Sequence, residues 1–248
     1  MSKRILVTGG AKGVGGAIVR ALATNGYDVD FTYRSSGAAA LELAKQLSEE
    51  TGRQINATEL DLSDRAALDA FCEKLQEETW YGFIHNAGQP YDALAAMMAQ
   101  DKAEAAMQVN FWSLTQIVKS VIRSMMRARE GRIAVMGSVT ALHGSQGNAA
   151  YAASKGAMLS YCRTLAVESA KRGITVNYIA PGFIDTDMMA SYAAYRENME
   201  KQIPAGRFAK TEEVAALCAF LMAETSAYIN GAYLPIDGGL TAMTGVHR

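Results

Sequence analysis

Short apolar runs alternate along the chain with amphipathic stretches. Seven runs rich in β-branched and other apolar residues predict strands at residues 4–8, 29–33, 54–60, 81–85, 132–136, 175–179 and 232–236. Between them, stretches with helical periodicity begin near Val14, Ala38, Asp64, Lys102, Ala149 and Thr211. Such alternation is typical of a parallel sheet with helices on both faces. The pattern therefore predicts a single doubly wound α/β domain, with about seven strands, over residues 1–248.

Two longer segments depart from this regular alternation. The stretch from Met107 to Arg129 is polar only at its end, so we expect it to pack against neighbours along most of its length. Residues 183–202 follow the strand at 175–179 and are irregular or weakly helical. Because ligands of open α/β sheets bind outside the carboxyl ends of the strands, residues 183–202 are a candidate substrate lid.

Composition excludes several classes of protein. Of the 248 residues, 50% are hydrophobic and 20% are charged, which argues against intrinsic disorder. The formal net charge of −1 argues against a nucleic-acid-binding protein, and no apolar run reaches the ~18 residues that a membrane span needs. The N-terminus lacks the pattern of a signal peptide, and three scattered cysteines favour neither disulfides nor a zinc site. We therefore expect a cytoplasmic protein without a metal.

A glycine-rich turn follows the first predicted strand and precedes a predicted helix. Its glycines have the spacing Gly-x-x-x-Gly-x-Gly, at Gly9, Gly13 and Gly15. Glycines let the backbone approach a pyrophosphate, and the N-terminus of the following helix favours an anion. A simple tight turn would explain the same glycines, but their place at the start of a βαβ unit favours a dinucleotide site.

The end of the second predicted strand indicates which dinucleotide binds. Where an NAD-binding protein usually carries an acidic residue, this chain has Tyr33, Arg34 and Ser35. An arginine suits a 2′-phosphate, and Lys12 in the glycine turn would add a second positive charge. The alternative is that both cations are ordinary solvated side chains. The pattern favours NADPH over NADH.

A tyrosine and a lysine four residues apart form the candidate catalytic pair. Tyr151 and Lys155 share one face of a predicted helix, about 5–6 Å apart at Cβ. An ammonium beside a phenol stabilises the phenolate and lowers the pKa of the tyrosine toward neutrality. Ser138 follows a predicted strand, where its hydroxyl can stabilise charge that develops on a carbonyl oxygen. A solvated helix pair and a turn serine are the alternatives for these residues taken singly.

These motifs, in this order and at these spacings, resemble those of the short-chain dehydrogenase/reductase family over essentially the whole chain. The matching pieces are Thr8–Gly15, Asp61 with Leu62, Asn86-Ala87-Gly88, Asn110, Ser138, Tyr151 with Lys155, and Pro181-Gly182. The resemblance implies a Rossmann-type fold. It also implies that Tyr151 is the general acid in reduction, that Ser138 orients the carbonyl and that Lys155 binds ribose and tunes the tyrosine. Asn110 would hold a water that relays protons through Lys155.

The same resemblance assigns a cofactor site and leaves some positions without a role. The residues expected to bind NADPH are Gly9, Lys12, Gly13, Val14, Gly15, Tyr33, Arg34, Ser35, Asp61, Leu62, Asn86, Ala87, Gly88, Tyr151, Lys155, Pro181, Gly182, Ile184 and Thr186. One departure is His85, which stands where relatives often have asparagine. His143 lies between Ser138 and Tyr151, but a loop histidine is more often solvated, so no role is assigned to it.

Within the family, the chain is most similar to 3-oxoacyl-acyl-carrier-protein reductases. Residues 180–188, 203–207 and 237–239 carry this likeness. It implies an acidic acyl carrier protein that docks on arginines near the active-site mouth, at positions matching Arg129 and Arg172, and a homotetramer. The alternative for both arginines is that they are cations favoured at helix C-termini. Residues 80–82 resemble reductases of polyketide clusters, including aryl-polyene pathways. The resemblance therefore implies a role in acyl-chain extension, in either fatty acid or polyketide synthesis.

Two other functions remain open at this point. The same machinery would serve a dehydrogenase of a sugar, a steroid or another secondary alcohol, because specificity resides in the loops. A non-catalytic dinucleotide-binding protein is the second alternative. The complete set of Asn110, Ser138, Tyr151 and Lys155 argues against it, since an idle relative is free to lose any of them.

Overall fold

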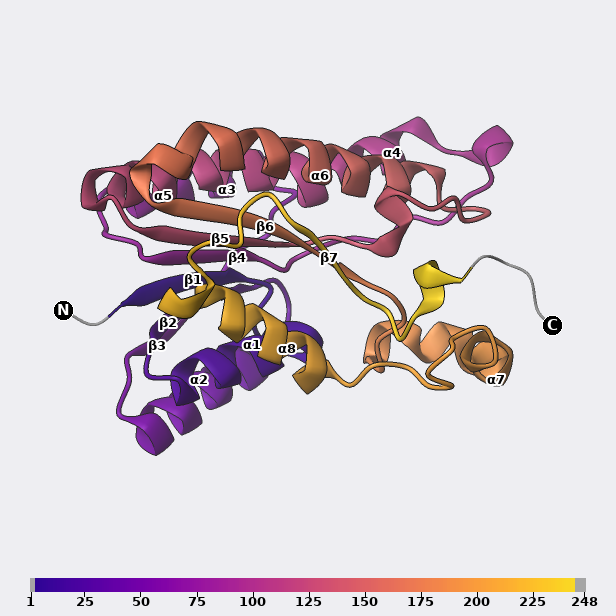
Figure 1. Cartoon of the computed structure of the whole chain (residues 1–248), viewed down its shortest axis with the longest axis horizontal. Coiled ribbons are helices and arrows are strands. Elements are labelled where there is room, and N and C mark those ends of the chain that lie inside the picture. The colour runs from indigo at the N-terminus through magenta and orange to yellow at the C-terminus, as the bar shows by residue number, and fades with distance from the viewer. Residues whose placement is uncertain (1–2, 244–248) are drawn as a thin grey trace.

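A parallel sheet runs through the middle of the computed structural model, which describes residues 3–243 (Figure 1). Its strands lie in the order β3-β2-β1-β4-β5-β6-β7. They are β1 (Arg4–Thr8), β2 (Asp28–Tyr33), β3 (Ile55–Glu59), β4 (Gly82–His85), β5 (Gly131–Met136), β6 (Ile174–Pro181) and β7 (Tyr233–Ile236). Because the order reverses between β1 and β4, a crevice for a ligand is expected at the carboxyl ends of these two strands.

Helices cover both faces of the sheet (Figure 1). On one face lie α3 (Arg65–Gln76), α4 (Gln100–Met107), α5 (Ser113–Ala128) and α6 (Ala149–Ser169), and on the other lie α1 (Gly13–Thr24), α2 (Gly37–Thr51) and α8 (Thr211–Met222). Successive strand side chains point to opposite faces, so Leu6 and Phe83 enter one hydrophobic core while Ile5 and Ile84 enter the other. The doubly wound seven-stranded sheet predicted from the sequence is confirmed, and the predicted strands and helix starts agree within about two residues.

The stretch from Met107 to Arg129, which we expected to pack against neighbours along most of its length, is helical but not a uniform α-helix. Residues Gln108–Trp112 form a π-helical turn between α4 and α5, and Arg129 ends α5 in the left-handed conformation with φ 55°. A π turn shifts the backbone hydrogen bonds of a helix, and here the carbonyl of Asn110 contacts the ring of His85 at 3.1 Å. Hydrophobic periodicity does not report such a turn, because the side chains on either side remain buried.

The segment predicted as a lid leaves the carboxyl end of β6. It contains a 3-10 turn (Asp187–Tyr195) and the short helix α7 (Arg196–Glu200). Arg196 bonds both carboxylate oxygens of Asp185, at 2.7 and 3.0 Å, and also bonds Glu200. The segment thus has defined local structure at the edge where ligands bind, and its closure over a substrate stays a prediction.

Three further features bear on the function. In the described part of the chain, no helix is long and apolar enough to cross a membrane. Cys72, Cys162 and Cys218 are buried free thiols. No group of three or more potential metal-ligating side chains occurs among residues 3–243.

Candidate active site

The glycine turn between β1 and α1 is shaped by close backbone contacts. Gly9 and Gly13 have φ values of +68° and +54°, which side chains rarely allow. A Cβ on Gly15 would lie 1.9 Å from the carbonyl oxygen of Gly9. Gly15 therefore has no room for a side chain, and the first N–H groups of α1 are available to a pyrophosphate.

A methyl group at Gly15 should therefore disrupt this turn. We expect Gly15→Ala to destabilise the fold by about 2 kcal/mol and to abolish detectable NADPH binding, because the backbone of the turn must move. Gly16→Ala is the matched control, since its Cβ would meet nothing closer than 3.6 Å. Thermal unfolding and NADPH fluorescence titration measure both effects, and equal NADPH affinity in the two variants would contradict the expectation.

Asn86 and Ala87 support the turn from β4. The side-chain amide of Asn86 donates hydrogen bonds to the carbonyls of Thr8 and Gly9, at 3.2 and 3.0 Å. The backbone N–H groups of Asn86 and Ala87 both donate to Thr8 Oγ1 at 3.1 Å. Asn86 was expected to line the cofactor, and the structure turns its amide toward the glycine turn, which it holds in shape.

The side chains expected around the adenosine lie at the ends of β2 and β3. Arg34 and Ser35 are exposed, and Tyr33 is half-buried. Hydrogen bonds from Ser63 and the charge of Arg34 hold the pKa of Asp61 below its usual value. Leu62 is only 5% exposed and belongs to the hydrophobic core, so its backbone alone is available to the cofactor. Lys12 is exposed at the start of α1, beside Gly13 and Val14.

Ser138, Tyr151 and Lys155 lie together at the carboxyl end of β5. Ser138 hydrogen-bonds the hydroxyl of Tyr151, and the Lys155 ammonium lies 5.4 Å from the centre of the Tyr151 ring. Lys155 Nζ also donates to the Met136 carbonyl at 2.9 Å. Three of the four residues predicted to be catalytic are thus neighbours, although 13 and 17 positions separate Ser138 from the other two.

Burial is the largest cause of the pKa shifts of Tyr151 and Lys155. Burial raises the pKa of Tyr151 to about 12, while the bond from Ser138 acts to lower it. Burial also lowers the pKa of Lys155 to about 8. The sequence predicted that Lys155 lowers the pKa of Tyr151, and in the structure burial raises it instead. At neutral pH the tyrosine therefore carries the proton that a general acid must donate.

Asn110 lies next to this group in the π turn. Its Nδ2 donates to Ser154 Oγ at 2.9 Å and to the Gln89 carbonyl at 3.1 Å, and its Oδ1 accepts from Gln89 N at 2.7 Å. A Cβ on Gly88 would lie 3.4 Å from both Asn110 Oδ1 and Lys155 Nζ. Asn110 Oδ1 and Lys155 Nζ thus lie near the same glycine, and the role of Asn110 in a proton relay stays a prediction.

His85 is a buried residue that connects Thr8 to Asn110, and the sequence did not indicate this role. Its Nε2 contacts the Asn110 carbonyl at 3.1 Å and its Nδ1 contacts Thr8 Oγ1 at 3.1 Å. Because a carbonyl can only accept, Nε2 carries the hydrogen and Nδ1 accepts from Thr8. Burial and the charge of Lys155 lower the pKa of His85 to about 3, so the ring is neutral.

Thr140 is a second residue missed from the sequence. Its N–H and hydroxyl both donate to Ser138 Oγ, at 3.2 and 2.9 Å. These two bonds leave the proton of the serine hydroxyl directed elsewhere, toward Tyr151 or a carbonyl. Spacing alone gave no signal for Thr140, because a threonine in a loop is a common turn residue.

The residues expected at the nicotinamide end also meet at this edge. Pro181 ends β6, and the Gly182 N–H donates to the Ile236 carbonyl of β7 at 3.1 Å. Ile184 forms an isolated β-bridge with Ala209. A Cβ on Gly13 would lie 3.7 Å from the methyl group of Thr186. The start of the predicted lid therefore lies against the glycine turn.

Arg129 and Arg172 lie at the opposite edge of the sheet. Arg129 precedes β5 and donates to the Lys171 carbonyl at 3.0 Å, and Arg172 precedes β6, so the two arginines are neighbours. Ser138 follows the other end of β5, roughly 20 Å away for a strand of this length. Tyr151 and Arg172 are at opposite ends of α6, which is about 30 Å long. Within one chain, these arginines are not at the active-site mouth.

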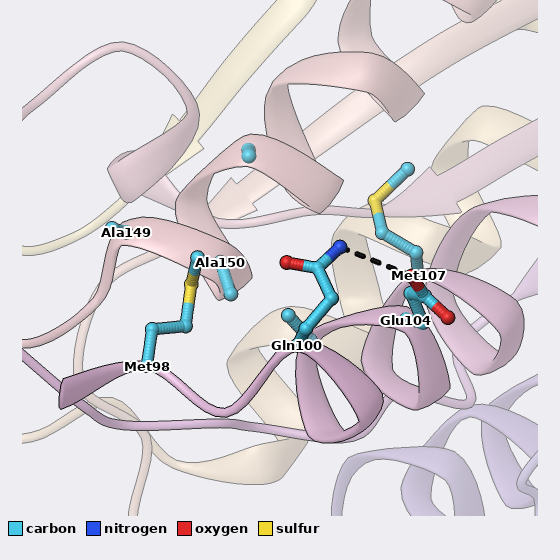
Figure 2. A pocket seen from close by; sticks show the side chains of 8 residues that line it. Met98, Gln100, Glu104, Met107, Ala149 and Ala150 are labelled. Atoms are coloured by element: carbon cyan, nitrogen blue, oxygen red, sulfur yellow. Dashed lines mark hydrogen bonds between the residues drawn. The ribbon is translucent and has the colours of Figure 1, made fainter. Parts of the chain in front are cut away.

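A small apolar pocket lies between α4 and the first turn of α6 (Figure 2). Its volume is about 230 Å³, and Met98, Met107, Ala149 and Ala150 are among the residues that line it. Figure 2 shows Gln100 beside the pocket, bonded to Glu104 at 3.0 Å. Ser138, Tyr151 and Lys155 are not among the residues that line this pocket.

Comparisons with known proteins agree with this geometry. A family model described as "Enoyl-(Acyl carrier protein) reductase" matches residues 9–241. The chain is 36% identical to the 3-oxoacyl-[acyl-carrier-protein] reductase FabG of Escherichia coli (strain K12), over 96% of this chain and 97% of that protein. A short-chain dehydrogenase/reductase from Serratia marcescens BCRC 10948 superposes with a TM-score of 0.89 at 31% identity, covering 96% and 98% of the two chains. A gluconate 5-dehydrogenase from Burkholderia cenocepacia J2315, in complex with NADP and tartrate, gives a TM-score of 0.90 at 28% identity, covering 98% and 97%.

Proposed function

The chain belongs to the short-chain dehydrogenase/reductase family, and we propose that it reduces 3-oxoacyl thioesters on an acyl carrier protein, with NADPH, to the 3-hydroxyacyl products. The observation that carries this proposal is the group of Ser138, Tyr151 and Lys155 at the carboxyl edge of the sheet, beside the glycine turn. The chain is an oxidoreductase, so the non-catalytic alternative is not retained.

Four side chains share the steps of the proposed reduction. When bound, NADPH supplies a hydride. Tyr151 donates its proton to the carbonyl oxygen at C3, and Ser138 hydrogen-bonds the same oxygen as negative charge develops there. Lys155 places a positive charge near the tyrosinate that remains, and Asn110 helps to return a proton through Lys155.

The remaining predicted contacts support NADPH as the cofactor. Arg34 and Lys12 are exposed cations beside the glycine turn and the end of β2, where a 2′-phosphate would be neutralised. The neighbour named as a gluconate 5-dehydrogenase was solved with NADP. Segment 183–202 would close over the substrate from the end of β6. A cytoplasmic location, where carrier-bound acyl chains are extended, completes the proposal.

Carrier docking requires a second copy of the chain if Arg129 and Arg172 take part. These arginines lie far from Tyr151 of their own chain, so they would serve an active site on a neighbouring subunit of the proposed homotetramer. Trp112 and Val167, on the outer side of the π turn and of α6, are 50% and 80% exposed and offer apolar surface for such an association. The pathway would be fatty acid or polyketide synthesis.

A dehydrogenase of a small secondary alcohol is the second candidate. The observation in its favour is the superposition on a gluconate 5-dehydrogenase at a TM-score of 0.90. The same tyrosine, serine and lysine would serve that reaction, because the fold does not determine the substrate.

The test is NADPH consumption with a 3-oxoacyl group on the carrier protein and on N-acetylcysteamine, with NADH in parallel. We expect faster turnover of the carrier-bound substrate, and only with NADPH. Arg172→Glu should raise KM for the carrier-bound substrate about tenfold, because an acidic partner would be repelled, and leave the small thioester unaffected. Turnover of sugars or acetoin in place of both thioesters would favour the second candidate.

A further inference from the structure

Tyr178 of β6 contacts the backbone of two of the proposed catalytic residues, Ser138 and Lys155. It is 1% exposed, and its hydroxyl accepts a hydrogen bond from the backbone N–H of Ser138 at 2.9 Å. The same hydroxyl lies 3.2 Å from the carbonyl oxygen of Lys155 and 3.3 Å from that of Ser138, so it donates to one or the other. Through its contact with the Lys155 carbonyl, this side chain connects the loop that carries Ser138 to the helix that carries Tyr151 and Lys155.

The sequence around Tyr178 makes room for this arrangement. A Cβ on Gly137 would lie 1.7 Å from Tyr178 Cζ, so the ring occupies space that only glycine leaves open. On its other side, the ring stacks on Tyr233 of β7, with centroids 5.7 Å apart and planes at 12°. Packing on both sides of the ring thus fixes the position of the hydroxyl independently of its hydrogen bonds.

The hydroxyl of Tyr178 acts as a hydrogen-bonding group and not as an acid or a base. Burial raises its pKa far above the neutral range, so it stays protonated. It can therefore accept from Ser138 N–H and donate to a carbonyl at the same time. Loss of the hydroxyl would leave the buried Ser138 N–H without this partner.

We propose that Tyr178 is a positioning residue that holds Ser138 in register with Tyr151. The inference rests on the proposed reduction of a carbonyl, in which the Ser138 hydroxyl bonds Tyr151 in the free enzyme and the substrate oxygen during the reaction. Thr140 hydrogen-bonds the Ser138 hydroxyl oxygen, and the Tyr178 hydroxyl accepts a hydrogen bond from the Ser138 backbone N–H. Two groups outside the catalytic set thereby define where the serine oxygen lies.

The test compares Tyr178→Phe with Tyr233→Phe. The first keeps the stacked ring and removes the hydroxyl that bonds Ser138. The second removes a buried hydroxyl for which the described part of the structure shows no hydrogen-bond partner, so it is a matched control. We expect Tyr178→Phe to lower kcat about tenfold with little change in NADPH affinity, and Tyr233→Phe to keep full activity.

A pH profile separates positioning from simple loss of stability. Oxidation of a 3-hydroxyacyl thioester needs deprotonated Tyr151, and the bond from Ser138 lowers the pKa of that tyrosine. In Tyr178→Phe, the rising limb of kcat/KM for oxidation should therefore move to higher pH, whereas a merely destabilised enzyme would lose activity equally at every pH. In a Ser138→Ala background, Tyr178→Phe should cause no further shift, because its effect passes through Ser138.

Hydrogen exchange of the peptide containing Ser138 gives a readout independent of turnover. Faster exchange in Tyr178→Phe than in Tyr233→Phe supports the proposal. Equal exchange together with an unchanged pH profile would overturn it. If the wild type reduces another ketone but no 3-oxoacyl thioester, the proposed function fails by itself, and the two variants are compared on that ketone.

Discussion

Replacement of Tyr151 by phenylalanine should lower kcat for the reduction of a 3-oxoacyl thioester by about 1,000-fold. The variant keeps the ring but removes the proton that Tyr151 donates to the carbonyl oxygen, and general acid catalysis contributes about 100- to 10,000-fold. Because burial raises the pKa of Tyr151 to about 12, nearly all wild-type molecules carry that proton at neutral pH. Affinity for NADPH should change little, since the glycine turn and Arg34 are untouched.

Tyr161→Phe provides the control for this experiment. Tyr161 lies on the same helix α6 and packs edge-on against Phe111, with ring centroids 6.0 Å apart, away from Ser138. Its variant should retain wild-type kcat. Steady-state loss of nicotinamide absorbance measures the rates, and fluorescence titration measures NADPH binding. Full turnover by Tyr151→Phe would refute the proposed acid.

Replacement of Arg34 by aspartate should reverse the preference between the two nicotinamide cofactors. The arginine would form charge-assisted hydrogen bonds to the 2′-phosphate, each contributing about 1.5–3 kcal/mol, and a carboxylate at that place repels the phosphate. We expect the ratio of kcat/KM for NADPH to that for NADH to fall at least about 100-fold. The aspartate can also accept a hydrogen bond from the free ribose 2′-hydroxyl of NADH, which should raise activity with NADH.

Arg20→Asp is the matched charge reversal. Arg20 is exposed on α1 and pairs with Glu50 of α2 at 3.3 Å. It changes the net charge by the same amount as Arg34→Asp, so any general electrostatic effect on an anionic cofactor appears in both variants. Initial rates over a range of both cofactors decide the result. A ratio that stays constant in Arg34→Asp would show that the 2′-phosphate binds elsewhere.

The two arginines expected to dock a carrier protein show what a sequence likeness leaves open. The structure brings Arg129 and Arg172 side by side through the bond from Arg129 to the Lys171 carbonyl. Their distance from Tyr151 follows from topology, because residues at the two ends of one strand or one helix lie on opposite edges of the sheet. A role in docking therefore depends on how copies of the chain assemble.

The secondary-structure elements of this protein and the identity of its chemical groups follow from the sequence alone. Alternating runs of apolar residues specify the strands and helices, because each strand must bury both faces and each helix one face. The glycine spacing and the interval from Tyr151 to Lys155 are local patterns, so they can be recognised without a fold. The seven-stranded sheet and the grouping of Ser138 with Tyr151 were both expected from these patterns.

The way in which those groups are held depends on the folded chain. The bonds of His85 to Thr8 and Asn110, of Thr140 to Ser138 and of Tyr178 to Ser138 and Lys155 join different strands, loops and helices. The π turn at Asn110 and the space that Gly137 leaves for Tyr178 likewise depend on neighbours distant in the chain. Close packing and the pairing of buried polar groups are properties of the assembled core, and no short window of sequence contains both partners.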